Sequence, residues 1–196
     1  MEALRPLEQL THPDPRQEGF ATFDPQSRTF RPVTVEDMYA RVKDIRLHAG
    51  VPEDVRSHFA TALNLAAYSW FCYPFNVTAQ LLGYISVEYA LRIRFPSVGR
   101  PPSFKKLVQR AVKEGLISDK GFSSHREPET DHYPPELVAL FVPPEPDAYV
   151  KALAESIPAL RNSLAHGARM LHMHGTSSVR VSAELINQLF PLPSDA

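Results

Sequence analysis

Apolar side chains recur every three or four positions along most of the chain between residues 34 and 190, which is the period of an amphipathic α-helix. Glycines, prolines and capping residues divide this pattern into separate segments. The predicted helices span residues 34–49, 52–73, 77–95, 104–114, 147–170 and 182–190. The pattern therefore predicts an all-α fold, a bundle of about five to six helices.

Local signals mark where these helices begin. Thr34 and Asp37 have the spacing of a capping box, in which two side chains satisfy free amide groups at a helix start. Pro74 interrupts the apolar pattern, and Asn76 is a suitable N-cap for the helix that follows. Ser103 is expected to cap the fourth helix. These signals favour several distinct helices over one continuous helix.

Two proline-rich segments do not fit the helical pattern. Residues 1–33 are interpreted as an irregular N-terminal arm, either lying on the bundle or partly disordered, with a short extended piece near residues 20–23. Residues 116–146 form a long loop rich in proline and acidic side chains, which would either shield basic residues from RNA or bind a partner. The run 177–181 is interpreted as extended. The predicted organisation is thus an arm followed by one helical domain, residues 34–196.

Composition narrows the class of protein. A net charge of −1 over 196 residues provides no global basic field, so nonspecific coating of nucleic acid is not expected. The single cysteine, Cys72, can form no intramolecular disulfide, which fits a reducing compartment. Residues 57–87 contain no Asp, Glu, Lys or Arg, but Pro74 divides them, which favours buried helices over a membrane span. No secretory signal is recognised, and we expect a cytoplasmic protein.

Seven basic residues and no acidic residue lie between positions 92 and 113. Such a run either binds phosphates or forms a solvated helix face. Glu88 lies four residues before Arg92, so its carboxylate either pairs with Arg92 or contributes to a site on a neighbouring helix. The candidate nucleic-acid-binding residues are Glu88, Arg92, Arg94, Lys105, Lys106 and Arg110.

Near the end of the predicted helix 147–170 lies the string Arg161-Asn162-Ser163-Leu164-Ala165-His166-Gly167. Asn162 and His166 are four residues apart and share a helix face, whereas Arg161 points about 140° away from His166. A two-fold dimer with this helix at its seam would let each Arg161 reach the other chain's His166. Alternatively, an arginine and a histidine in a last helical turn simply face water and complement the helix dipole.

This string resembles the signature of the HEPN family (higher eukaryotes and prokaryotes nucleotide-binding), in which an arginine followed by a polar residue precedes a histidine. The stretch from Thr34 to Phe190 resembles a HEPN-like helical bundle with the motif on a late helix. The segment from Val87 to Arg92 resembles the helix that packs beside the motif helix.

The resemblance implies a metal-independent endoribonuclease that uses the 2′-hydroxyl of RNA as nucleophile and leaves a cyclic phosphate. Arg161 would hold the scissile phosphate, His166 would transfer protons, and Asn162 would orient the imidazole or bind the phosphate. It implies a homodimer with a composite site, acting on RNA as a toxin or defence component, without a metal or another cofactor.

Other functions remain open at this stage. Many HEPN domains are noncatalytic modules that bind RNA, a nucleotide or a partner protein such as an antitoxin, and the chain is also compatible with a structural bundle whose motif only packs a dimer. His166, His172 and His174 form a histidine cluster, but no cysteine or suitably spaced carboxylate accompanies them. A metal site is therefore not predicted.

Overall fold

Helices make up most of the computed structural model, which describes residues 4–124, 145–167 and 171–192. Within these residues the α-helices are α1 (Val35–Val42), α2 (Glu53–Tyr68), α3 (Phe75–Arg94), α4 (Phe104–Lys113), α6 (Ala148–Ala165) and α7 (Gly175–Leu189). Strands β1 (Ala21–Asp24) and β2 (Thr29–Pro32) pair as an antiparallel hairpin, and short 3-10 helices lie at Leu7–Gln9, Pro15–Gly19 and Asp119–Gly121. In the described part of the chain, no helix has the length and apolar character needed to cross a bilayer.

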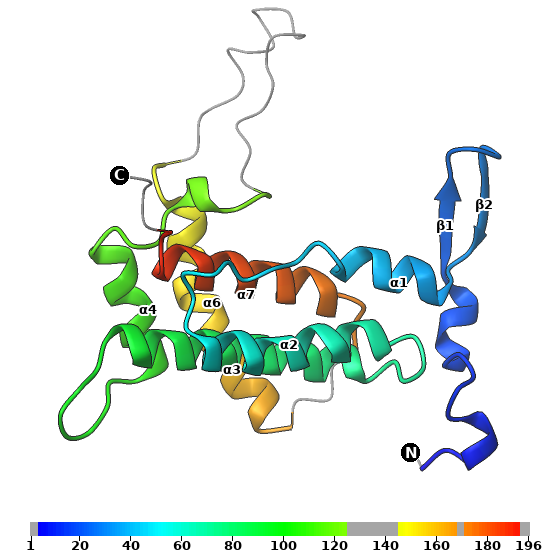
Figure 1. Ribbon diagram of the computed structural model, residues 1–196, viewed down its shortest axis with the longest axis horizontal. Coiled ribbons are helices and arrows are strands. Elements are labelled where there is room, and N and C mark those ends of the chain that lie inside the picture. Colours follow the sequence, from blue (N-terminus) through cyan, green and yellow to red (C-terminus); the bar gives the residue numbers. More distant parts are fainter. Residues whose placement is uncertain (1–3, 125–144, 168–170, 193–196) are drawn as a thin grey trace, which may run out of the picture.

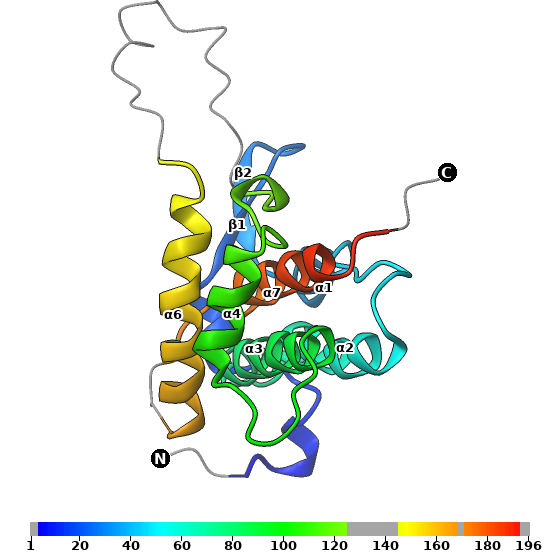
Figure 2. The ribbon, with the colours of Figure 1, turned by 90° about the vertical axis from the view of Figure 1, so that its left-hand side faces the viewer.

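Helix α3 lies at the centre of the bundle. It packs against α7 and α2 along its length, while α4 and α6 stand side by side across this layer (Figures 1 and 2). Gly83 permits the close approach of α3 to α7, because a Cβ atom there would lie 2.9 Å from the Ser182 hydroxyl. The small side chains of Gly83 and Ser182 therefore allow α3 and α7 to pack closely against each other.

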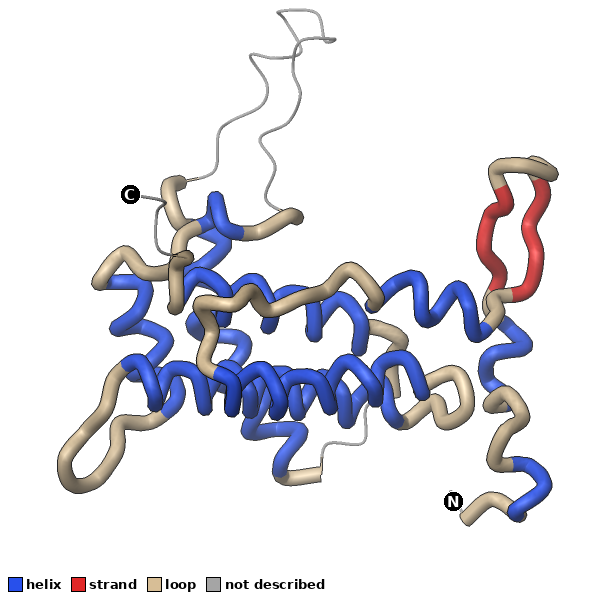
Figure 3. Tube along the Cα trace, in the orientation of Figure 1, coloured by secondary structure: helices blue, strands red, loops and turns tan. Residues whose placement is uncertain are grey.

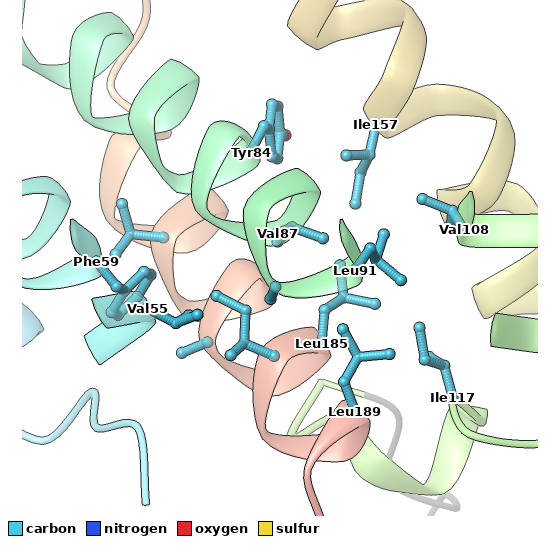
Figure 4. Packing of buried hydrophobic residues seen from close by; sticks show 14 of the residues in the cluster. Val55, Phe59, Tyr84, Val87, Leu91, Val108, Ile117, Ile157, Leu185 and Leu189 are labelled. Carbon is cyan, nitrogen blue, oxygen red and sulfur yellow. The ribbon is translucent and has the colours of Figure 1, made fainter. Parts of the chain in front are cut away.

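The hydrophobic core joins all the major helices (Figure 4). Phe59 of α2, Leu91 of α3, Ile157 of α6 and Leu185 of α7 are each at most 2% exposed. Burying aliphatic and aromatic side chains of this size contributes about 1.5–3 kcal/mol each. Because Ile157 belongs to this core, α6 and the motif that it carries are held firmly against α3.

The capping predictions are confirmed at two helix starts and wrong at a third. Thr34 and Asp37 exchange the two hydrogen bonds of a capping box, and the Ser103 hydroxyl accepts a hydrogen bond from the Lys106 amide. Asn76 does not cap α3, which begins at Phe75 with Pro74 in the cap position. The Asn76 side chain is instead buried and donates to the Tyr73 carbonyl at 3.1 Å.

Helix α1 is shorter than predicted, because it ends at Val42 and not at residue 49. The chain beyond it is bound to α7 through Asn187. The Asn187 side chain accepts a hydrogen bond from the His48 amide at 3.1 Å and donates to the Arg46 carbonyl at 2.9 Å. These contacts satisfy backbone groups that a longer helix would have paired internally.

Helix α2 ends at Tyr68, five residues before the predicted end. The N-terminal arm takes over the backbone groups that follow. Gln17 donates to the Ser69 carbonyl at 3.0 Å, the Asp14 amide donates to the Trp70 carbonyl at 2.9 Å, and the Asp14 carboxylate accepts from the Tyr73 amide at 2.9 Å. The arm thus lies on the bundle, one of the two arrangements that the sequence left open.

The arm is also more regular than predicted, since it contains two 3-10 helices and the hairpin (Figure 3). The extended piece expected near residues 20–23 is strand β1. Phe23 of β1 faces Phe30 of β2 with their ring centroids 5.6 Å apart. This cross-strand aromatic pair supports a hairpin that the sequence pattern did not reveal.

Helix α7 begins at Gly175, so the predicted extended run 177–181 and the predicted start at residue 182 are wrong. Ser178 and Val179 are buried against the bundle, as are residues one and two turns later. Packing against α3 overrides the strand preference of a serine- and valine-rich segment. Helix α6 ends at Ala165, five residues before the predicted end of helix 147–170, because Gly167 adopts a positive φ. Most of the proline-rich loop, residues 125–144, lies outside the described residues.

Candidate functional site

A charged cavity of about 420 Å³ opens where the end of α3, the segment leading into α4 and the second half of α6 meet. Pro101, Pro102 and Pro158 form part of its wall. Its ionisable and amide side chains are Glu88, Arg92, Arg100, Lys105, Arg161 and Asn162. The fold therefore brings two motif residues together with three bases from the basic run.

Glu88 of α3 links this helix to α6 at the cavity. Its side chain is 9% exposed, and Oε1 accepts a hydrogen bond from Arg92 Nη2 at 2.6 Å. Oε2 lies 2.6 Å from Arg161 Nη2 as an ion pair, although the angle is not that of a hydrogen bond. Glu88 therefore pairs with Arg92, as the four-residue spacing suggested, and also faces Arg161 on the motif helix.

Arg161 is oriented by contacts on two sides. Besides the ion pair with Glu88, its Nη1 donates to the Asn162 side-chain oxygen at 3.1 Å. The Arg161 side chain remains 29% exposed, so part of the guanidinium faces the cavity. An arginine fixed in this way offers a planar, charged donor for a phosphate or carboxylate group.

His166 lies one turn after Asn162, at the end of α6. Its amide donates to the Asn162 carbonyl at 3.0 Å, and Gly167 closes the helix with a φ of 83°. His166 is exposed and does not line the cavity. In a single protomer the structure therefore brings Arg161 and Asn162 to the cavity and leaves His166 outside it.

The other predicted nucleic-acid-binding residues divide into two groups. Lys105 lines the cavity and pairs with Glu155 of α6 at 2.5 Å; this ammonium and the Gln109 amide hold the pKa of Glu155 below its ordinary value. Arg110 is engaged elsewhere, because it pairs with Glu114 at 2.7 Å and covers the Phe95 ring. The exposed residues of this group that do not line the cavity are Arg94, Lys106 and Arg110.

Arg100 is the cavity residue that sequence reasoning passed over. It belongs to the basic run, but it is in a loop, and no helical spacing relates it to Arg161. The signal that could have identified it is its position three residues before Ser103, the cap of α4. A base just before a helix start lies close to the free amide groups of that helix.

His166, His172 and His174, all within the described residues, do not come together as metal ligands. His172 Nε2 is 2.8 Å from the Gln80 side-chain oxygen, and the His174 amide donates to His172 Nδ1 at 3.1 Å. Across residues 4–124, 145–167 and 171–192, no three side chains of His, Cys, Asp or Glu come together as metal ligands. His172 therefore belongs to a hydrogen-bond network between α3 and α7.

Comparisons with protein-family models, with curated proteins and with solved structures give no match. The resemblance to the HEPN family is therefore carried by the motif residues and their setting in this chain.

Proposed function

We propose that the protein is a HEPN-type, metal-independent endoribonuclease that acts as a homodimer, with Arg161, Asn162 and His166 as its catalytic residues. The observation that supports this most directly is the placement of Arg161 and Asn162 at a cavity with Arg92, Arg100 and Lys105 in its lining. A cavity with this lining suits the phosphates of RNA, which dominate the affinity of most RNA-binding surfaces.

The residue types suit attack by the RNA's own 2′-hydroxyl. A base removes the 2′-hydroxyl proton, the oxygen forms a bond to phosphorus, and the bond to the 5′-oxygen breaks as that oxygen gains a proton. The products are a 2′,3′-cyclic phosphate and a 5′-hydroxyl. His166 would move one of these protons, since histidine ordinarily changes charge near neutral pH. Arg161 would stabilise the charge that accumulates on the phosphate oxygens.

The surface of α6 is compatible with the proposed two-fold pairing. Ala152, Ser156, Ala159 and Ser163 are exposed and recur every three or four residues, so they form one small, uncharged face. His166 follows Ser163 by three residues and adjoins the same face. Two α6 helices packed along this face would bring each His166 toward the partner protomer, where an Arg161 already faces its cavity.

The test is cleavage of single-stranded RNA in EDTA by the wild type and by His166→Ala. We expect the variant to lose at least about a hundredfold in rate, which is the ordinary contribution of general acid–base catalysis. His12→Ala is the matched control, because His12 is an exposed histidine in the arm, far from α6 in sequence. Equal cleavage by wild type and His166→Ala would remove the catalytic assignment.

A second function, a noncatalytic HEPN module that binds RNA, a nucleotide or a protein such as an antitoxin, is favoured by the Glu88 contact. A guanidinium already paired with a nearly buried carboxylate is partly neutralised, which suits binding and structure better than stabilisation of a transition state. This function predicts RNA binding by wild type and His166→Ala alike, with no cleavage by either protein.

A further inference from the structure

The charged cavity extends beyond the motif residues to the start of α4. On that side its wall is formed by Arg100, the two prolines that follow it, Ser103 and Lys105. Arg161 and Asn162 of α6 form a different part of the wall. A cavity of about 420 Å³ falls in the range of small-molecule sites and has room for more than one phosphate group.

The charges around this cavity do not balance. The cations Arg92, Arg100, Lys105 and Arg161 line it, while Glu88 compensates the first and last of these and Glu155 pairs with Lys105. Four cations and two carboxylates leave two positive charges uncompensated. Arg100 forms no ion pair with any side chain of residues 4–124, 145–167 or 171–192. The surplus therefore equals the charge of one dianion.

The first turn of α4 adds to this surplus. Helix starts usually carry acidic side chains that offset the helix dipole, but α4 has Lys105 and Lys106 there and no acid. The Ser103 hydroxyl accepts from the Lys106 amide, so the amides of Phe104 and Lys105 have no partner within the helix. Three of these residues, Ser103, Phe104 and Lys105, line the cavity. An anion in the cavity would offset a local excess of positive charge that the described side chains leave in place.

We infer that Arg100, Lys105 and the first turn of α4 form a second phosphate subsite, distinct from Arg161, that binds a phosphomonoester dianion. A phosphomonoester carries about −1.5 to −2 charges near neutral pH, whereas a phosphodiester in the RNA backbone carries one. The ligand is the terminal phosphate of an RNA or of a free nucleotide. This inference rests on the proposed function only for placing RNA at Arg161.

The experiment titrates a short 2′-O-methyl RNA with a 5′-phosphate, and the same RNA with a 5′-hydroxyl, into the full chain. Methylation blocks the attacking oxygen, so binding is measured without cleavage. We expect Arg100→Gln and Lys105→Gln each to weaken binding of the phosphorylated RNA about tenfold, the effect of one charge-assisted hydrogen bond. Lys113→Gln, the matched control, removes the same charge from the other end of α4, outside the cavity, and should weaken binding less than about threefold.

A parallel titration with AMP identifies the source of the phosphate. Tighter binding of the phosphorylated RNA than of AMP assigns the subsite to RNA ends, and equal binding assigns it to free nucleotides. No preference for phosphorylated over unphosphorylated RNA, together with no binding of AMP, would overturn the inference. Equal weakening by Arg100→Gln and Lys113→Gln would also overturn it. Loss of cleavage in His166→Ala bears on the proposed function alone, because this assay contains no cleavage step.

Discussion

Arg161 of α6 is bound to Glu88 of α3 within one protomer, with Arg161 Nη2 2.6 Å from Glu88 Oε2. This contact turns the guanidinium toward α3 and away from the exposed face on which His166 lies. In a composite dimer site, the imidazole of the partner protomer therefore has to approach Arg161, because Arg161 is already held in place. The contact also makes Glu88 the residue on which the geometry of the cavity depends.

Glu88→Gln tests that dependence. The loss of the Glu88 charge leaves Arg92 and Arg161 without their common counterion. Removing one partner of a fully buried ion pair lowers the free energy of unfolding by several kcal/mol. The loss is smaller here because both arginines are partly exposed. We expect a loss of about 1–3 kcal/mol in the free energy of unfolding, or several degrees in the melting temperature. Thermal and urea denaturation measure both quantities.

Glu155→Gln is the control for this prediction. Its ion pair with Lys105 also joins α6 to another helix, but the Glu155 side chain is 57% exposed and that of Lys105 is 50% exposed. Such solvent-exposed pairs contribute little to stability, because water and salt screen the charges. A Glu155→Gln variant that loses as much stability as Glu88→Gln would contradict the special role of the buried carboxylate.

Gly175 at the start of α7 is expected to tolerate no side chain. A Cβ atom there would lie 2.6 Å from the carbonyl oxygen and 2.8 Å from the Cα atom of Asn76, and these backbone atoms cannot turn aside as a flexible side chain could. Gly175→Ala should therefore lower the free energy of unfolding by about 1–3 kcal/mol, measured by urea denaturation. Gly19→Ala, where no heavy atom lies within 4 Å, should change it by less than about 0.5 kcal/mol; an equal effect of both would refute the steric explanation.

The features that sequence reasoning predicted correctly depend on neighbours a few residues away. The capping box of Thr34 and Asp37 and the cap at Ser103 involve partners three residues apart. The amphipathic spacing of Leu107, Val108 and Ala111 likewise matches the buried face of α4. Such signals are local, so a single sequence contains them.

The features that were missed depend on partners far along the chain. The chain after α1 is not helical because its backbone groups at Arg46 and His48 bind the Asn187 side chain. Asn187 lies 141 and 139 positions after these two residues. The spacing of four residues pointed to Arg92 as the partner of Glu88, but no local pattern relates Glu88 to Arg161 on another helix. Arg100 joins the site because the loop between α3 and α4 places it at the same cavity as Arg161 of α6, which only the tertiary structure reveals.

Asp14 anchors the N-terminal arm to the bundle. Burial by itself raises the pKa of its carboxyl, but hydrogen bonds from Arg16 and from the Tyr73 amide outweigh burial and leave that pKa below its ordinary value. Asp14→Ala leaves the buried Tyr73 amide unpaired, at a cost of about 1–3 kcal/mol. We expect faster tryptic cleavage after Arg16 and faster hydrogen exchange at Tyr73.

Asp24→Ala separates anchoring of the arm from a general loss of structure. Asp24 is in the exposed hairpin, and its carboxylate accepts hydrogen bonds from the Gln26 amide and the Ser27 hydroxyl. This variant should loosen the hairpin turn and leave hydrogen exchange at Tyr73 unchanged. If Asp14→Ala also leaves Tyr73 exchange unchanged, the arm is held by other contacts.

His172 is expected to make the α3–α7 contact sensitive to acid. Burial, and then the nearby His174, lower the pKa of His172 below its ordinary value of 6.5. The hydrogen-bond partners assign the neutral form, in which Nε2 donates to Gln80 and Nδ1 accepts from the His174 amide. The folded state binds the second imidazole proton of His172 less tightly than the unfolded state does. The contribution of neutral His172 to stability is therefore complete above pH 6.5 and is lost as the pH falls through the lowered pKa. Melting temperatures between about pH 7.5 and pH 5 should therefore fall more steeply for the wild type than for His172→Gln.

His12→Gln, which removes an exposed histidine, should retain the wild-type slope. Equal slopes for the wild type and His172→Gln would show that protonation of His172 does not weaken the packing of α7 on α3.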